Sequence, residues 1–244
     1  MPQNLQNENS VNTQNNKVRY GIERIIISGI FNCFVGLSVL VGLMALGIPL
    51  LIAILLAILT ASIGVFFLAK RLPSELIGIR IRKPWLSFFW FITALSSVLL
   101  IGRLSIFMID PTQTQHSLFP GDQWMIEHCC LTAYNESARF VSEGVNNIYQ
   151  KELYFGEEFK TNKEVRRKLD GFNVDPYHYP PPFLLLPIMA RAVVGGSFLD
   201  LRMLWFAIGV LSLLIAIGFI TYRLELEGRL RMIGMAPLFW CSMP

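Results

Sequence analysis

The amino-acid sequence predicts an all-α integral membrane protein, a multi-span helical bundle with a large outer loop. Hydrophobic residues make up 53% of the 244 residues and charged residues 16%, whereas about a quarter of residues are charged in soluble globular domains. No charged residue occurs in the ranges 25–69, 84–102 and 203–222. Because a membrane-spanning helix needs roughly 20 apolar residues, these runs indicate a membrane protein.

Four membrane spans are expected, near residues 25–45, 49–69, 85–109 and 201–222. The first charge-free run is long enough for two spans, and Gly47-Ile48-Pro49 provides the break between them. The first sixteen residues are rich in Asn and Gln and have no apolar face, so the N-terminal tail is expected to be disordered. The predicted organisation is a tail (1–24), a two-span hairpin (25–69), a basic loop (70–84) and a helical region (85–244) that contains the outer loop (110–182).

Lysine and arginine residues collect in the tail, in the basic loop and after residue 222. Short cytoplasmic loops of membrane proteins carry an excess of these residues, so all three segments are expected to be cytoplasmic. The N-terminus then lies inside and the loop 110–182 outside. In a bacterium the membrane would be the plasma or inner membrane.

The outer loop contains an expected amphipathic helix from Trp124 to Val145, which Asp122 would cap. Its apolar residues recur at spacings of three and four, so the helix is expected to lie on the bilayer surface with this apolar stripe down. Its other side carries His128, Asn135, Arg139 and Ser142. The adjacent Cys129 and Cys130 are interpreted as small apolar residues, with a redox or metal role as the alternative. The charged stretch 151–175 is interpreted as a surface excursion or a flexible loop.

An aromatic and proline-rich run, residues 177–187, leads out of the loop. Three consecutive prolines favour polyproline II, and the last of them can occupy the first position of a helix. The apolar stretch 183–194 is too short to span a bilayer, so it is expected to form a re-entrant or interfacial helix that turns at Gly195-Gly196 into the fourth span. The alternative is that Pro180 to Pro182 only stiffen a junction between loop and helix.

Glu143-Gly144, then Asn147-Ile148-Tyr149, then Tyr179-Pro180-Pro181-Pro182-Phe183 follow one another after an outward-going span. This succession resembles the GT-C superfamily of membrane glycosyltransferases, and it is most similar to the family 87 polyprenyl-phosphate-mannose-dependent mannosyltransferases, over about residues 100–244. The resemblance implies transfer of mannose or another hexose from a polyprenyl-phosphate sugar donor to a lipid, glycan or protein acceptor on the outer face. No cofactor is expected and no residue is predicted to bind a metal ion. Members of this family have further spans beyond the matched region, so the chain is expected to be an N-terminal fragment.

The resemblance also implies a carboxylate in the first outer loop that acts as general base on the acceptor hydroxyl. Asp110 at the end of the third span and Asp122 at the start of the amphipathic helix are the two candidates. Each has a simpler interpretation, because Asp110 can merely mark the membrane boundary and Asp122 can merely cap the helix.

Six further residues are candidates for substrate binding. A charged residue within or beside a span is a functional candidate by default, although an arginine near the end of a span can also extend its side chain to the interface. Arginine suits the phosphate of the donor, and the remaining candidates neighbour the carboxylates or the proline run. The six are Arg103, Glu127, His128, Tyr179, Arg191 and Arg202.

The alternative function is a non-enzymatic multi-span membrane protein, such as a transporter or an assembly subunit. A transporter would favour repeated halves with broken helices, and the sequence has no internal repeat. No phosphate-binding glycine-rich loop, zinc-ligand spacing or serine nucleophile elbow occurs either. The net charge of +4 comes from the connections that are expected to be cytoplasmic, so nucleic acid is not an expected partner.

Overall fold

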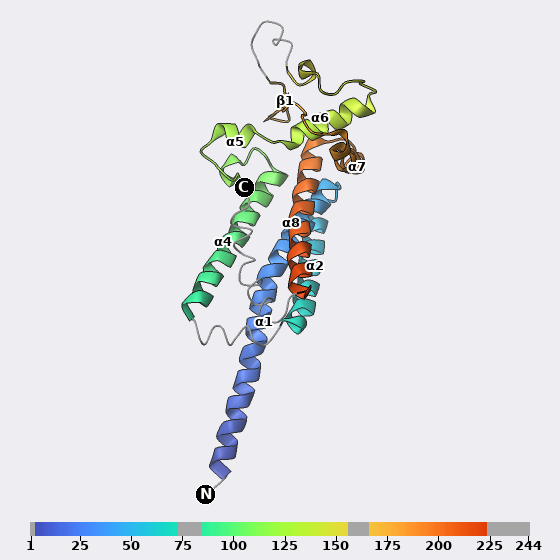
Figure 1. The fold of residues 1–244 in the computed structure, drawn as a ribbon. Coiled ribbons are helices and arrows are strands. Elements are labelled where there is room, and N and C mark those ends of the chain that lie inside the picture. The colour runs from blue at the N-terminus through green and yellow to red at the C-terminus, as the bar shows by residue number, and fades with distance from the viewer. Residues whose placement is uncertain (1–2, 73–83, 156–165, 224–244) are drawn as a thin grey trace. The chain divides into compact units, whose positions relative to one another are not determined.

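Residues 3–72, 84–155 and 166–223 are described by a computed structural model (Figure 1). It is mainly helical, and four of its helices are long and apolar enough to cross a membrane: Arg24–Ala45, Leu50–Arg71, Phe88–Ile109 and Phe198–Ile220. These helices coincide with the four expected spans to within a few residues. Parts of the expected basic loop (73–83), outer loop (156–165) and C-terminal region (224–244) lie outside the described residues.

The elements follow one another in a simple order along the chain. The long helices are α1 (Gln3–Ala45), α2 (Leu50–Arg71), α4 (Pro84–Ile109) and α8 (Phe198–Arg223). Between α4 and α8 lie η1 (Thr114–His116), α5 (Gln123–Glu127), α6 (Leu131–Ser142), η2 (Lys151–Leu153), β1 (Lys168–Leu169), β2 (Phe172–Asn173), η4 (Pro181–Leu184) and α7 (Leu185–Val193).

The turn between α1 and α2 forms where the sequence predicts it. Gly47 adopts a φ of +75°, and its N–H donates to Met44 O at 2.9 Å, while the N–H of Ile48 donates to Leu43 O at 3.0 Å. This pattern of two bonds closes a helix with glycine in the left-handed region, and Pro49 then starts the next helix. The tail differs from the expectation, because α1 begins at Gln3 and residues 3–24 are helical. Extending a formed helix costs less than nucleating one, so a polar segment can continue an apolar span.

The described residues divide into two compact units. The first contains α1 up to Val39, α2 from Ile54 and the part of α4 up to Ile101. Small residues bring α1 and α2 close together here, since a Cβ atom at Gly64 would lie 1.9 Å from Asn32 Oδ1. Ser28 Oγ also donates to Val65 O at 2.9 Å.

The second unit comprises Leu40–Ala53 and Gly102–Gly209, and therefore includes the whole segment between α4 and α8. Figure 1 shows α6 and α7 lying across the start of α8. Three groups of buried side chains hold the unit together, one around Tyr154 and Tyr177, one around Phe172 and Leu201, and one around Val41 and Met203. The Tyr154 hydroxyl donates to Ile148 O at 2.5 Å and lies 2.8 Å from Ser137 Oγ.

The expected amphipathic helix is divided in two, which corrects the sequence-based prediction. Helix α5 ends at Glu127, and His128 is extended, with ψ +126°, and pairs with Asn173 of β2. Helix α6 then starts at Leu131 and ends before Gly144, which adopts a φ of +77°. The helix is interrupted because His128 pairs with Asn173, 45 positions further along the chain, although the apolar spacing in the sequence continues through His128.

Helix α6 is also more covered than a helix lying on a bilayer surface. Residues from both of its sides are buried, including Ala138 from the apolar stripe and Asn135 and Glu136 from the polar one. The exposed apolar surface lies instead on η4 and α7, where Leu185, Leu186 and Met189 keep more than 60% of their surface exposed. The polar side of α6 is buried because its side chains form ion pairs and hydrogen bonds with other parts of the chain.

Candidate functional site

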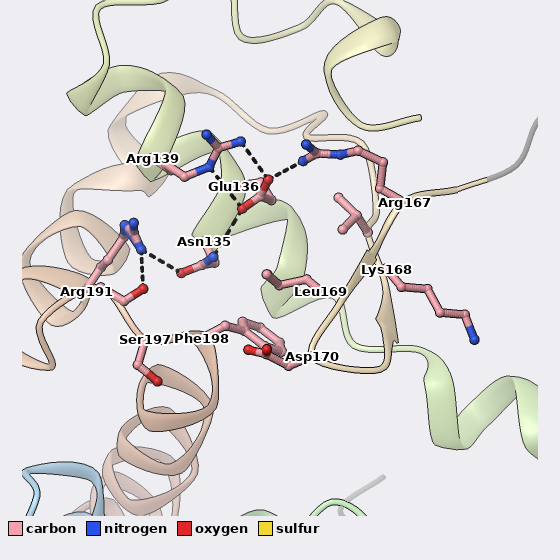
Figure 2. Close-up of a pocket in the computed structure, with 12 residues that line it drawn as sticks. Asn135, Glu136, Arg139, Arg167, Lys168, Leu169, Asp170, Arg191, Ser197 and Phe198 are labelled. Carbon is pink, nitrogen blue, oxygen red and sulfur yellow. Dashed lines mark hydrogen bonds and ion pairs between the residues drawn. The ribbon is translucent and has the colours of Figure 1, made fainter. Parts of the chain in front are cut away.

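A cavity of about 610 Å³ lies beside the start of α8 (Figure 2). Four of its lining residues are basic and two are acidic, which makes it suited to an anion. Side chains come to it from α6, from the β1–β2 hairpin and from α7. The lining residues are Asn135, Glu136, Arg139, Arg167, Lys168, Leu169, Asp170, Val174, Arg191, Gly196, Ser197 and Phe198.

The hairpin of strands β1 and β2 brings Arg167 and Lys168 to the cavity. Strands β1 and β2 are antiparallel, with Lys168 opposite Asn173 and Leu169 opposite Phe172. Asp170 and Gly171 form the turn with φ values of +50° and +90°. Asp-Gly is a preferred pair for a turn with two positive φ angles, because both residues tolerate the left-handed region.

A buried carboxylate organises the polar side of α6. Glu136 is 4% exposed and accepts hydrogen bonds from Arg139 Nη2 at 3.0 Å, from Arg139 Nε at 3.3 Å and from Arg167 Nη2. The bonds to Glu136 raise the pKa of Arg139, so this guanidinium stays charged. Arg167 keeps a buried Nε without a hydrogen-bond partner within the described ranges.

Arg191 is held over the N-terminus of α8. Its Nη1 donates to Gly196 O at 2.6 Å and to Asn135 Oδ1 at 3.3 Å, while Nη2 has no hydrogen-bond partner among the residues that the structure describes. Ser197 precedes α8, and its Oγ accepts from the N–H of Asp200 at 3.3 Å. The first N–H groups of a helix and a nearby arginine both attract anions. The cavity therefore contains the chemistry of a phosphate site.

The two predicted catalytic carboxylates lie outside this cavity lining and differ from each other. Asp110 uses both oxygens: Oδ1 accepts from Thr112 N at 3.0 Å and Thr112 Oγ1 at 2.6 Å, and Oδ2 accepts from Gln113 Nε2 at 3.4 Å. These bonds, chiefly those from Thr112, lower the pKa of Asp110. Asp122 caps α5 as expected, with Oδ1 accepting from the N–H groups of Trp124 at 3.0 Å and Met125 at 3.2 Å.

Glu127 and Tyr179, two of the predicted binding residues, make contacts within the protein. Glu127 Oε2 lies 2.7 Å from Lys168 Nζ, so α5 is connected to a lysine of the cavity. This hydrogen bond is the main cause of the lowered pKa of Glu127. The ring of Tyr179 stacks on Tyr134 with a centroid distance of 5.3 Å, and its carbonyl accepts from the hydroxyl of Tyr149 at 3.0 Å.

Arg103 and Arg202 bind backbone carbonyls. Arg103 Nη2 donates to Ser117 O at 3.0 Å and to Gln115 O at 3.2 Å, which ties the residues after α4 back to that helix. Arg202 is 4% exposed, donates to Phe107 O at 3.2 Å and lies over the rings of Phe107 and Phe172. Of the three predicted arginines, only Arg191 lines the cavity.

His128 lies between a thiol and a carboxylate. Its Nε2 is 3.4 Å from Cys130 Sγ and its Nδ1 is 3.3 Å from Asp175 Oδ2. These three side chains are metal-ligand types, and their ligand atoms lie within 4.8 Å of one another. In the structure, however, the histidine turns opposite ring nitrogens towards its two neighbours.

The sequence analysis does not identify Glu136, Arg139, Arg167 or Asp170 as site residues. The Asp-Gly pair at 170–171 is a hairpin signal that would have brought Arg167 and Lys168 together with the following strand. Nothing in the sequence shows that this hairpin packs against α6. No family model, curated protein or solved structure matches the chain.

Proposed function

We propose that the chain belongs to a GT-C-type membrane glycosyltransferase, which moves a hexose such as mannose from a polyprenyl-phosphate donor to an acceptor on the outer face. The observation that carries this proposal is the basic cavity beside α8, because it combines phosphate-binding groups with an apolar helix. The N-terminal tail and the basic loop lie in the cytoplasm, and the segment between α4 and α8 lies outside. The lipid bilayer holds both enzyme and donor.

The donor phosphate binds at Arg191. Its free Nη2 and the N-terminus of α8, where Phe198 lines the cavity, are the donors that the cavity offers to phosphate oxygens. Lys168 and Arg139 add positive charge, although both already contact carboxylates. Glu136 acts through the two arginines that it orients.

The isoprenoid chain of the donor follows α7. Arg191 belongs to this helix, and the exposed apolar residues Leu185, Leu186 and Met189 precede it by two to six positions. A helix with one exposed apolar face and one cationic end is suited to the boundary between acyl chains and headgroups. In this arrangement α7 is the interfacial or re-entrant element that the sequence predicts.

Asp122 is the general base that we propose. Helix N–H groups hold its Oδ1, while Oδ2 has no hydrogen-bond partner in the described parts of the chain. Asp110 is the weaker candidate, because both oxygens accept hydrogen bonds and its pKa is lowered. Asp122 lies at the start of α5, and Glu127 at the end of α5 forms an ion pair with Lys168 of the cavity lining. The five residues of α5 span about 8 Å between these two ends.

The proposed reaction is a single displacement. Asp122 Oδ2 takes the proton of the acceptor hydroxyl as the oxygen attacks the anomeric carbon. The new C–O bond forms while the bond from that carbon to the lipid phosphate breaks, with inversion. The charge that returns to the phosphate is stabilised by Arg191 and the α8 N-terminus.

Transfer of labelled hexose from a polyprenyl-phosphate donor, measured with the full-length protein in membranes, tests the proposal. Arg191→Gln removes the guanidinium, and a lost charge-assisted hydrogen bond of about 1.5–3 kcal/mol lowers the kcat/KM for the donor about 10- to 150-fold. The control is Lys151→Gln, which changes an exposed lysine outside the cavity. Equal kcat/KM values for the two variants would contradict the assignment of the phosphate site, and the absence of transfer by the unmodified protein would favour a transporter or an assembly subunit.

A further inference from the structure

We propose that Cys130, His128 and Asp175 form a nucleophilic thiol site that accepts an acyl group from an activated ester or thioester. This activity is separate from sugar transfer and does not use the basic cavity. The site lies where the chain passes from α5 to α6, and it opens into a second cavity of about 220 Å³.

The distances follow the order nucleophile, base and orienting group. Cys130 Sγ lies 3.4 Å from His128 Nε2, and His128 Nδ1 lies 3.3 Å from Asp175 Oδ2. The last two atoms are buried and form no hydrogen bond with each other or with another described residue, so a rotation of the imidazole is needed to complete this contact. Such contacts are often slightly long in a structure without substrate. A thiol, an imidazole and a carboxylate in this order form the arrangement that activates cysteine nucleophiles.

Neighbouring groups fix the imidazole and the carboxylate. Trp124 stacks on the His128 ring with a centroid distance of 4.4 Å and an angle of 12°. Arg166 Nη1 donates to Asp175 Oδ1, which leaves Oδ2 for the histidine. The N–H of Asp175 donates to Thr132 Oγ1 at 3.1 Å, and this bond connects the segment after β2 to the first turn of α6. These contacts hold the imidazole and the carboxylate close to each other.

The position of Cys130 suits nucleophilic attack. Cys130 is the N-cap residue of the 12-residue α6, and its side chain makes no capping hydrogen bond. The neighbouring imidazole of His128 is placed to take the thiol proton during attack. The thiol is exposed and faces the cavity that Ala133, His178 and Tyr179 also line, whereas burial raises the pKa of the adjacent Cys129.

A metal ion fits these residues less well. The imidazole offers opposite nitrogens to the thiol and the carboxylate, so binding of one ion would require one of these two contacts to rearrange. Arg166 adds a fixed positive charge at Asp175, and a like charge disfavours a cation there. The ion pair with Arg166 is instead compatible with an Asp175 carboxylate that orients His128.

The acyl transfer is balanced without a further reactant. His128 Nε2 takes the thiol proton as Cys130 Sγ attacks the carbonyl carbon of the ester or thioester. An S–C bond forms, the bond from the carbonyl carbon to the leaving oxygen or sulfur breaks, and the proton passes from His128 to the leaving group. The product is an acyl thioester on Cys130.

The test uses 4-nitrophenyl acetate with the full chain in detergent, and mass spectrometry identifies the acetylated cysteine. We expect Cys130 to be acetylated at least tenfold faster than Cys129 at pH 7. His128→Gln should slow the acetylation of Cys130 about 100-fold, which is the lower end of the rate loss expected when a general base is removed. Asp175→Asn slows it less and shifts its pH profile, which a purely structural change would not do.

The unmodified protein provides a result that does not depend on the folding of a variant. Its acetylation rate at Cys130 should exceed the rate at Cys129 in the same molecule, because Cys130 is exposed beside an imidazole. Equal rates at Cys129 and Cys130, or a rate at Cys130 that does not depend on His128, would overturn the proposal. A stoichiometric zinc ion that protects Cys130 from acetylation would also overturn it.

Discussion

Gly195→Ala and Gly196→Ala form a matched pair of substitutions at the turn between α7 and α8. Both glycines have positive φ angles, +66° and +88°, which disfavour any residue with a Cβ atom. Each alanine therefore costs about 1–2 kcal/mol of backbone strain. For a chain of this size, that corresponds to a melting temperature roughly 2–8 °C lower for either variant.

Only one of the two substitutions reaches the cavity. A Cβ atom at Gly196 would lie 3.3 Å from Arg191 Nη2 and 3.4 Å from Nη1, whereas a Cβ atom at Gly195 meets nothing within 4 Å. The guanidinium must move by a few tenths of an ångström and loses part of its bond to Gly196 O. Because a charge-assisted hydrogen bond contributes about 1.5–3 kcal/mol, a partial loss should weaken binding of the lipid phosphate about tenfold.

Binding of a radiolabelled polyprenyl phosphate to the detergent-solubilised protein measures this difference, alongside thermal unfolding of both variants. The expected result is a similar loss of stability for the two alanines and weaker binding for Gly196→Ala alone. Equal binding by Gly195→Ala and Gly196→Ala, at equal stability, would refute the role of Arg191 in phosphate binding.

Three further predictions concern stability, pH and the membrane. Glu136→Gln removes the negative charge that Arg139 and Arg167 share as a partner, so it should lower the free energy of unfolding by about 3 kcal/mol. This value is at the low end for a broken buried ion pair, because both arginines are partly exposed. Unchanged thermal unfolding would contradict this prediction. Burial raises the pKa of Tyr177 to about 12, above its ordinary value near 10, so the folded state holds this proton more tightly and its stability should fall as the pH rises from 10 to 12. This part of the pH dependence should be absent in Tyr177→Phe, and an identical pH profile for both proteins would contradict it. A photoreactive amino acid in place of the exposed Leu186 should cross-link to lipid, and cross-linking to water-soluble protein alone would exclude α7 from the interface.

The spans were predictable because their signal is local. Charge-free runs of the required length and the Gly47–Pro49 break depend only on neighbouring residues, and the structure has helices at these places. The capping role of Asp122 was predictable for the same reason. The helical state of residues 3–24 was not, because polar composition alone favoured disorder.

The division of the outer-loop helix could not be predicted from periodicity. His128 leaves the helix because it pairs with Asn173, and a contact over this sequence distance is invisible in a window of one or two turns. Contacts over similar sequence distances cover the polar side of α6, because Arg167 binds Glu136 and Arg191 binds Asn135, so residues that look solvated line a cavity instead.

The arginines predicted to bind phosphate also show what the sequence alone cannot distinguish. Arg191 was a predicted phosphate ligand because it interrupts an apolar stretch, and the structure places it in the cavity lining. Arg103 and Arg202 carry the same local signal, yet they bind carbonyl groups of the protein. Only the three-dimensional packing distinguishes an arginine that has a free donor from one whose donors serve the fold.

Sugar transfer by the full-length protein, compared between Asp122→Asn and Asp110→Asn, tests the central claim most directly. Loss of a general base lowers the rate about 100-fold or more, so we expect Asp122→Asn to lose transfer while still binding the polyprenyl-phosphate donor. Asp110→Asn should keep transfer within about tenfold, because its carboxylate serves the turn after α4. Undiminished transfer by Asp122→Asn would contradict the proposed catalytic role.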